Sequence, residues 1–191
     1  EVLEAFERAR NAGKTRFIGF TAKGKPDDLV SLVQSERFDS AQIFYNLLVP
    51  SAGEAVPEDY PADDFKQLLS VARKHGVGSI GVRVLAGGAL AGHTQRHPLG
   101  MPTVVPIGSD TDYATDAQRA LLFQRMIDEG FATDLPSLAM RYVISHPQLC
   151  TTEIGIATLE EVEHATKAIN DGPLSAEALT EIAAIQRGLV S

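Results

Sequence analysis

Apolar and polar residues follow two different periods along the chain. Four short, largely apolar runs have the length of buried strands, and between them apolar residues recur three or four positions apart, as on one face of a helix. The pattern predicts strands at residues 16–21, 38–46, 78–85 and 150–156. It predicts helices at residues 2–12, 62–76, 114–129 and 135–144, with further helices beginning at Pro26, at Leu159 and after Ser175.

The order of these elements is helix then strand, four times over, with helices at the end. Such alternation predicts parallel strands joined by crossover helices, and so a single α/β domain over residues 1–191. Periodicity alone leaves two arrangements open: half of a (β/α)8 barrel of the TIM type, and an open doubly wound sheet. Neither a Gly-x-Gly-x-x-Gly turn nor a Walker-type loop occurs at a strand–helix junction.

Some charged and irregular segments have an ordinary structural explanation. Acidic pairs stand at the predicted starts of three helices, where the helix dipole favours negative charge without any catalytic role. The stretch at about residues 93–113 shows no periodicity, and loops of that length in a compact domain are usually functional or mobile. The acidic pairs are Asp27-Asp28, Asp63-Asp64 and Glu160-Glu161.

The composition of the chain argues against some classes of binding partner and favours one cellular compartment. The chain has 25 acidic and 17 basic residues and a net charge of -8, which argues against nucleic acid and anionic membrane surfaces, since both require clustered Lys and Arg. No apolar run reaches the roughly 18 residues of a membrane span. The single cysteine, Cys150, cannot form an internal disulfide, which favours the reducing cytoplasm. We expect Cys150 to be a small buried residue and His164 to lie on a helix surface.

Four stretches, taken in order, resemble one enzyme family. Residues 13–21, Gly-Lys-Thr-Arg-Phe-Ile-Gly-Phe-Thr, resemble the GK-x-R-x-IG-x-S strand of the aldo-keto reductases. Residues 38–48 carry a Gln followed by Tyr-Asn-Leu-Leu, and residues 75–90 end in Leu-Ala-Gly-Gly-Ala-Leu. In residues 155–174, Gly-Pro-Leu precedes the closing helix. Together these motifs resemble the C-terminal half of the family's barrel, about four βα units.

The resemblance implies an activity and a cofactor. Members of the family transfer hydride between NAD(P)H and an aldehyde, a ketone or a sugar-type alcohol. In the family, side chains at the ends of two neighbouring strands hold the nicotinamide carboxamide, and here those places are Thr21, Ala22 and Gln42. Thr21 and Gln42 supply a donor and an acceptor, whereas Ala22 replaces an amide. Val82 stands where an aromatic residue usually stacks on the ring, so packing is expected without stacking.

The residues after the third strand resemble the family's pyrophosphate site. Arg83 could pair with the cofactor pyrophosphate at the mouth of a barrel, or with a structural carboxylate instead. Leu85, Ala86 and Gly87 begin a turn in which glycines let backbone N–H groups approach a phosphate, although the segment could also be only a turn.

The turn after the fourth strand resembles the family's adenosine 2′-phosphate site. This turn runs from Gly155 to Glu161. Ile156 and Glu161 occupy places where a small polar or basic residue would favour the phosphate, and an acid can accept a hydrogen bond from a ribose hydroxyl instead. We therefore expect NAD to be tolerated at least as well as NADP, with the choice between them left open.

No catalytic residue and no metal site is predicted within the chain. The resemblance places the Asp, Tyr, Lys and His of the reaction on four preceding strands, and the chain opens at Glu1 inside a helical pattern. Such a half-barrel should be inactive alone, and its open sheet edges should require an N-terminal half or another chain. The alternative is a non-catalytic half-barrel that binds nucleotide or a protein partner. His93 and His97 lie in an irregular segment before Pro98, which argues against a zinc site there.

Overall fold

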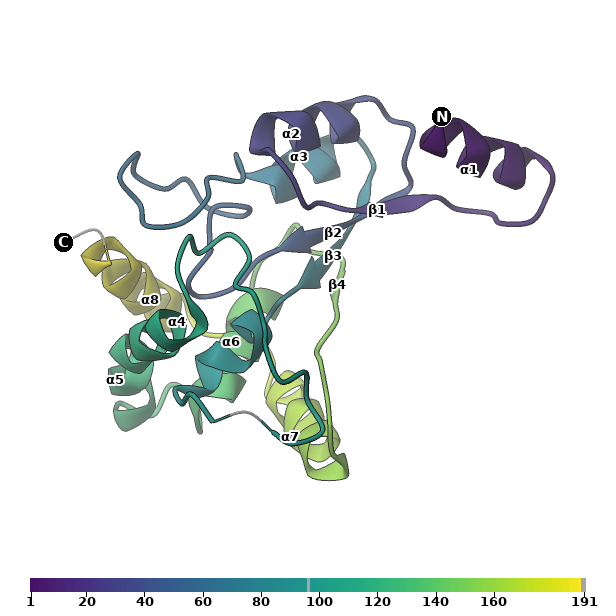
Figure 1. The fold of residues 1–191 in the computed structure, drawn as a ribbon. Helices are drawn as coiled ribbons and strands as arrows, with labels where there is room; N and C mark the ends of the chain where they lie inside the picture. Colours follow the sequence, from purple (N-terminus) through teal and green to yellow (C-terminus); the bar gives the residue numbers. More distant parts are fainter. Residues whose placement is uncertain (96, 190–191) are drawn as a thin grey trace.

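Four parallel strands form one sheet in the order β1-β2-β3-β4 (Figure 1). The computed structural model describes residues 1–95 and 97–189. The parallel pairing confirms the predicted α/β class, and each strand is shorter than the apolar run that predicted it, because only part of each run joins the ladder. The strands are β1 (Gly19–Thr21), β2 (Ser40–Phe44), β3 (Gly78–Val82) and β4 (Thr151–Thr152).

The register divides the sheet into two faces. Thr21 pairs with Gln42, Gln42 with Ile80, and Ile80 with Thr151, so these positions share one face. None of these four is fully buried. On the opposite face of β2, Ala41 and Ile43 are both fully buried. The chain therefore covers one face of the sheet with its helices, and the other face carries Thr21 and Gln42 beside the apolar Ile80, Val82 and the buried Phe44.

Helices α2 (Pro26–Gln34) and α3 (Leu68–Lys74) cover the buried face of β2 and β3. They lie side by side on one side of the sheet (Figure 1). Leu29 and Val33 of α2 pack with Leu68 and Leu69 of α3. The buried residues of β2, Ala41 and Ile43, belong to the same core. Burying these side chains supplies the main stabilising energy of this layer, at roughly 1.5–3 kcal/mol each.

Three later helices begin at polar N-caps. The Asp134 carboxylate accepts from the Ser137 N–H at the start of α6 (Leu135–Ile144), and Thr158 caps α7 (Leu159–Asn170) in the same way. Ser175 accepts from the Ala178 N–H and caps α8 (Ala176–Gly188), which confirms the predicted cap.

The helix predicted at residues 62–76 begins later than expected. Asp63 and Asp64 precede α3, and Lys66 and Gln67 have positive φ values of 55° and 51°. Ser51 holds this segment in place, because its hydroxyl donates to the Asp63 carbonyl and accepts from the Phe65 N–H at 3.1 Å. The interpretation of Asp63-Asp64 as helix-dipole partners is therefore wrong: tertiary hydrogen bonds hold the backbone in a turn.

The helix predicted at residues 114–129 is also interrupted. It consists of α4 (Tyr113–Ala120), a 3-10 turn η2 (Leu121–Phe123) and α5 (Gln124–Asp128). Ala120, Phe123 and Met126, each three positions apart, are all fully buried, so the segment presents these side chains to the core across the 3-10 turn. Periodicity predicted the helical content but not the 3-10 turn.

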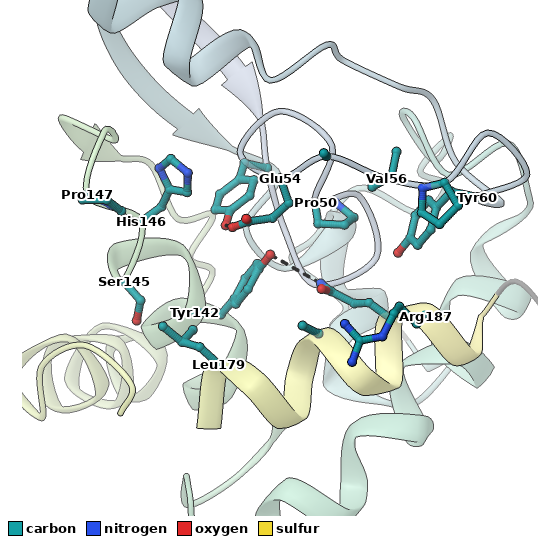
Figure 2. Close-up of a pocket in the computed structure, with 15 residues that line it drawn as sticks. Pro50, Glu54, Val56, Tyr60, Tyr142, Ser145, His146, Pro147, Leu179 and Arg187 are labelled. Carbon is teal, nitrogen blue, oxygen red and sulfur yellow. Dashed lines mark hydrogen bonds between the residues drawn. The ribbon is translucent and has the colours of Figure 1, made fainter. Parts of the chain in front are cut away.

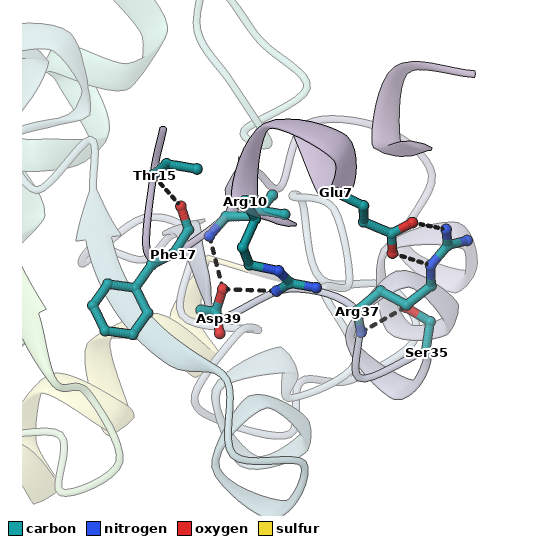
Figure 3. Close-up of polar contacts among 8 residues, drawn as sticks. Glu7, Arg10, Thr15, Phe17, Ser35, Arg37 and Asp39 are labelled. Atoms are coloured by element: carbon teal, nitrogen blue, oxygen red, sulfur yellow. Dashed lines mark hydrogen bonds and ion pairs between the residues drawn. The ribbon is translucent and has the colours of Figure 1, made fainter. Parts of the chain in front are cut away.

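Helix α1 (Val2–Asn11) projects away from the rest of the chain (Figure 1). It buries no residue, and Phe6 is 49% exposed. Charged contacts attach it instead: Arg37 binds the Glu7 carboxylate with two nitrogens, at 2.9 and 2.8 Å, and Arg10 lies 3.4 Å from Asp39 (Figure 3). The hydrogen bond from Arg37 lowers the pKa of Glu7. The apolar face of α1 is thus left uncovered by residues 1–95 and 97–189.

Two side chains lie in environments different from those expected. Cys150 is exposed rather than buried, because it precedes β4, the strand at one edge of the sheet, and is held there by its backbone N–H to Ser79. His164 is half-buried and lies 2.8 Å from the Asp134 carboxylate and 3.1 Å from the Ser137 hydroxyl. It therefore joins α7 to the start of α6 instead of lying free on the surface. No helix in the described ranges is long and apolar enough to cross a membrane.

Candidate functional site

The polar face of the sheet carries a row of three hydrogen-bonded side chains. The Thr21 hydroxyl donates to Oε1 of Gln42 at 2.7 Å, and Nε2 of Gln42 donates to a carboxylate oxygen of Glu153 at 3.1 Å. Thr21 ends β1, Gln42 lies in β2, and Glu153 follows β4. The row therefore spans the whole sheet, and it brings together the two residues predicted to grip a carboxamide.

Both predicted residues keep free hydrogen-bonding capacity. A primary amide has two N–H donors and two acceptor positions, and a hydroxyl that donates can still accept. After its bonds to Thr21 and Glu153, Gln42 retains one donor and one acceptor position. Thr21 is exposed, so a ligand lying on this face can reach both groups.

Two other predicted positions contribute packing only. Val82 ends β3 two residues beyond Ile80, so the pleat places it on the same face as Gln42, where it is half-buried. Ala22 is fully buried among the core residues and supplies no polar group. The amide that Ala22 replaces by resemblance therefore has no substitute at that position.

The turn after β3 has an unusual backbone. Arg83 and Ala86 have φ values of 60° and 49°, and Gly87 has 70°, all in the left-handed region that residues other than glycine rarely adopt. The Ala86 N–H donates to the Arg83 carbonyl at 2.8 Å, and Leu85 accepts from the N–H of Gly88 at 2.7 Å. Such strained turns cluster at ligand sites, and concave runs of backbone N–H groups bind anions.

Packing also constrains Gly87. A Cβ at this position would lie 2.6 Å from Cγ1 of Val104 and 3.0 Å from Nη1 of Arg83. Val104 belongs to the irregular segment after η1 (Ala86–Ala91), so this segment passes directly over the turn. The glycine therefore has a packing role here, and its contact with a phosphate remains a prediction.

Asn46 is a structural residue of this region that sequence patterns did not single out. Its side chain is 1% exposed, and Nδ2 donates to the Arg83 carbonyl at 3.0 Å. Its Oδ1 accepts from the N–H groups of Leu48 and Val49 at 2.9 and 3.0 Å. Asn46 thus ties the loop after β2 to the loop after β3 and holds Arg83 in its left-handed conformation.

The turn after β4 is occupied mainly by its own capping contacts. A carboxylate oxygen of Glu161 accepts from the Ala157 N–H at 2.6 Å, and the Glu161 N–H donates to Thr158. Gly155 has open space where a Cβ would be, and Ile156 is 45% exposed. This turn is open to solvent, and its acid stabilises the start of α7.

A cavity in the described part of the chain lies elsewhere. It has a volume of about 570 Å³ and opens between the loop after β2, the end of α6 and α8 (Figure 2). None of the nine predicted cofactor residues lines it. Two contacts join polar side chains of its lining: the Tyr45 hydroxyl donates to Glu54, and Gln186 donates to the Tyr142 hydroxyl. Burial raises the pKa of both tyrosines, so both phenols remain neutral.

The position of this cavity does not argue against the predicted site. In a closed barrel, a ligand lies at the mouth formed by the carboxyl ends of all the strands. Four strands present an open face instead of an enclosed volume, so Thr21 and Gln42 lie on a surface. A separate space beside Arg83 and Ala86 measures only about 10 Å³.

One member of the polar row was missed by the sequence analysis. Glu153 stood in a predicted strand, but nothing in the linear pattern related it to Gln42, which lies 111 positions earlier. The sequence carried no signal for this contact, because Glu153 is exposed beside two threonines, Thr151 and Thr152, and an exposed acid requires no partner.

A four-stranded parallel sheet covered by helices on one face matches the fold of about half of a TIM-type barrel. Residues 1–187 match the sequence model of the aldo/keto reductase family, and the chain belongs to this family. No curated protein matches the chain.

Solved structures show the same fold. The chain is similar to aldo-keto reductase AKR11C1 from Bacillus halodurans in its holo form, with a TM-score of 0.63 and 20% sequence identity over 97% of this chain. The apo form gives a TM-score of 0.62, also at 20% identity. In both comparisons the chain spans 55% of the length of the matched protein.

Proposed function

We propose that the chain provides the cofactor-binding half of an NAD(P)-dependent aldo-keto reductase. In this proposal the protein transfers hydride between a nicotinamide and an aldehyde, a ketone or a sugar-type alcohol. Membership of the family supports an oxidoreductase. The observation that carries the cofactor role is the pairing of Thr21 with Gln42 at 2.7 Å, on the face of the sheet that the chain leaves open.

The residues present fit a nicotinamide carboxamide. The remaining N–H of Gln42 can donate to the carboxamide oxygen, and the free acceptor positions of Gln42 and Thr21 can receive its NH₂ group. Val82 supplies an apolar surface on the same face, on which a ring can pack. When bound, the nicotinamide would supply the hydride chemistry, and these residues would fix the orientation of its ring.

The proposal assigns the diphosphate to the turn at Arg83, Leu85, Ala86 and Gly87. Its support is the left-handed backbone and the guanidinium, which can form paired hydrogen bonds with phosphate oxygens. The proposal assigns the adenosine part of the cofactor to the open turn at Gly155 and Glu161. Because an acid does not favour a 2′-phosphate, this turn favours NAD at least as much as NADP.

The acid and base groups of the reaction are proposed to lie outside residues 1–191, on strands that complete the barrel. The chain spans 55% of the length of the matched structures, and β1 and β4 each pair with only one strand among the described residues. The proposed substrate is a small carbonyl compound or alcohol, and the proposed location is the cytoplasm.

Calorimetric titration of the purified protein with NADH and NADPH tests the cofactor role. We expect binding, and we expect Gln42→Leu to weaken it about tenfold, because a hydrogen bond to the carboxamide is lost and Thr21 is left without its partner. Gln118→Leu, at an exposed position of α4, is the matched control and should leave the affinity unchanged. Absence of binding by the unaltered protein would reject the proposal.

A second candidate is a non-catalytic half-barrel that binds nucleotide or a protein partner. The uncovered apolar face of α1, with Phe6 49% exposed and Val2 72% exposed, favours a protein partner. An intact mass of the purified protein separates the two candidates. A mass well above 20.5 kDa favours a complete barrel, and a mass of 20.5 kDa without cofactor binding favours the module.

A further inference from the structure

Glu153 lies on the open face of the sheet although it belongs to the strand farthest from Thr21. Its backbone N–H donates to the Gly81 carbonyl at 2.9 Å, so the β4 ladder continues through it. Its carboxylate meets the Gln42 amide at 3.1 Å, with β3 between their two strands. Both side chains therefore reach over β3 on the side where the nicotinamide is proposed to lie.

The carboxylate fixes the direction of the whole row. A carboxylate only accepts hydrogen bonds, so the NH₂ group of Gln42 must face Glu153 and its oxygen must face Thr21. Thr21 is then required to donate, as observed. The acceptor positions presented to a ligand are thus set by an acid two strands away.

The negative charge of Glu153 has no ion-pair partner among residues 1–95 and 97–189. Its nearest polar partner is the neutral amide of Gln42. An unpaired charge beside a ligand site attracts or repels the charge of the ligand, and because Glu153 is exposed, solvent reduces the size of this effect.

We propose that Glu153 makes this site prefer the oxidised nicotinamide. The inference rests on the proposed cofactor role of Thr21 and Gln42. The carboxamide held by Gln42 is attached directly to the ring, and that ring carries a positive charge in NAD(P)⁺ and none in NAD(P)H. The carboxylate of Glu153 therefore attracts one form and not the other, which biases the enzyme toward oxidation of an alcohol.

The test compares dissociation constants for NAD⁺ and NADH, and for the phosphorylated pair, measured by calorimetry on the purified protein. Glu153→Gln keeps an acceptor for the Gln42 amide and removes only the charge. We expect the ratio of the oxidised to the reduced dissociation constant to rise about threefold in the variant, as for an exposed charge. Glu163→Gln, which removes an exposed charge from α7, is the control and should leave the ratio unchanged.

The possible outcomes separate this inference from the proposed function. An unchanged ratio, or an equal loss of affinity for both forms, would mean that Glu153 only orients Gln42, and would overturn the inference alone. Binding of neither form by the unaltered protein would overturn the proposed cofactor role, and this inference with it.

Discussion

The side-chain amide of Asn46 donates to the backbone carbonyl of Arg83 at 3.0 Å and joins the loops that follow β2 and β3. The same side chain accepts from two N–H groups of its own loop, those of Leu48 and Val49. A single buried amide thus ties the turn after β3, to which the proposed diphosphate site is assigned, to the loop after β2.

Replacing Asn46 should therefore destabilise the fold. Asn46→Ala leaves buried donors and the Arg83 carbonyl without their side-chain partner, and we expect the free energy of unfolding to fall by roughly 2–4 kcal/mol. Urea denaturation measures the change. Asn170→Ala, at the exposed end of α7, is the matched control and should change stability by less than about 0.5 kcal/mol. Equal stability of the two variants would show that the Asn46 bonds contribute little.

Gly53 should be difficult to replace because of close packing. A Cβ at this position would lie 2.7 Å from Cδ2 of His146 and 2.8 Å from Cε2 of Tyr45. We expect Gly53→Ala to lower the free energy of unfolding by about 1–3 kcal/mol, since both rings must shift. Thermal denaturation should show no such loss for Gly188→Ala, where a Cβ meets nothing within 4 Å. A fully stable Gly53→Ala protein would contradict the packing argument.

Asp134 should make stability depend on pH in the acidic range. Burial alone would raise its pKa, but hydrogen bonds from Ser137 and the contact with His164 hold the pKa below the ordinary value. Because the folded pKa lies below the unfolded one, the stabilisation is present above the unfolded pKa of about 3.9 and is lost as pH falls through the folded pKa.

Asp134→Asn should reduce this loss of stability at acidic pH. The variant keeps a capping oxygen and removes the charge, so its urea midpoint should fall less than that of the unaltered protein between pH 6 and about pH 3. Asp59→Asn, an exposed loop variant, is the control. Identical pH profiles for the unaltered protein and Asp134→Asn would show that Asp134 does not cause the loss of stability at acidic pH.

Thr21→Val tests the polar row without disturbing the core. The side chain is exposed, so stability should change by less than about 0.5 kcal/mol. The Gln42 oxygen loses its hydroxyl donor and the carboxamide loses the acceptor that Thr21 offers, so we expect cofactor affinity to fall about three- to tenfold in the same calorimetric titration. Thr180→Val, on α8, is the control. An unchanged affinity would mean that Thr21 does not contribute to cofactor binding.

The sequence alone determined the class of fold. Apolar runs of strand length and helical periodicity predicted the parallel strands β1 to β4, and α6 agreed with its predicted bounds because Asp134 caps its start and most of its side chains are buried. The proximity of Thr21 and Gln42 could also be predicted from the sequence, since both lie near the ends of neighbouring parallel strands.

Only the tertiary structure decided the start of α3, the exposure of Cys150 and the meeting of Gln42 with Glu153. In each case the deciding contact joins residues distant in sequence, such as Ser51 with Asp63 or Gln42 with Glu153. Local periodicity reports which face of an element is apolar, but it contains no information on which distant backbone or side chain will occupy that face. The sequence therefore predicted the elements and their order, and packing decided where they end and which polar groups meet.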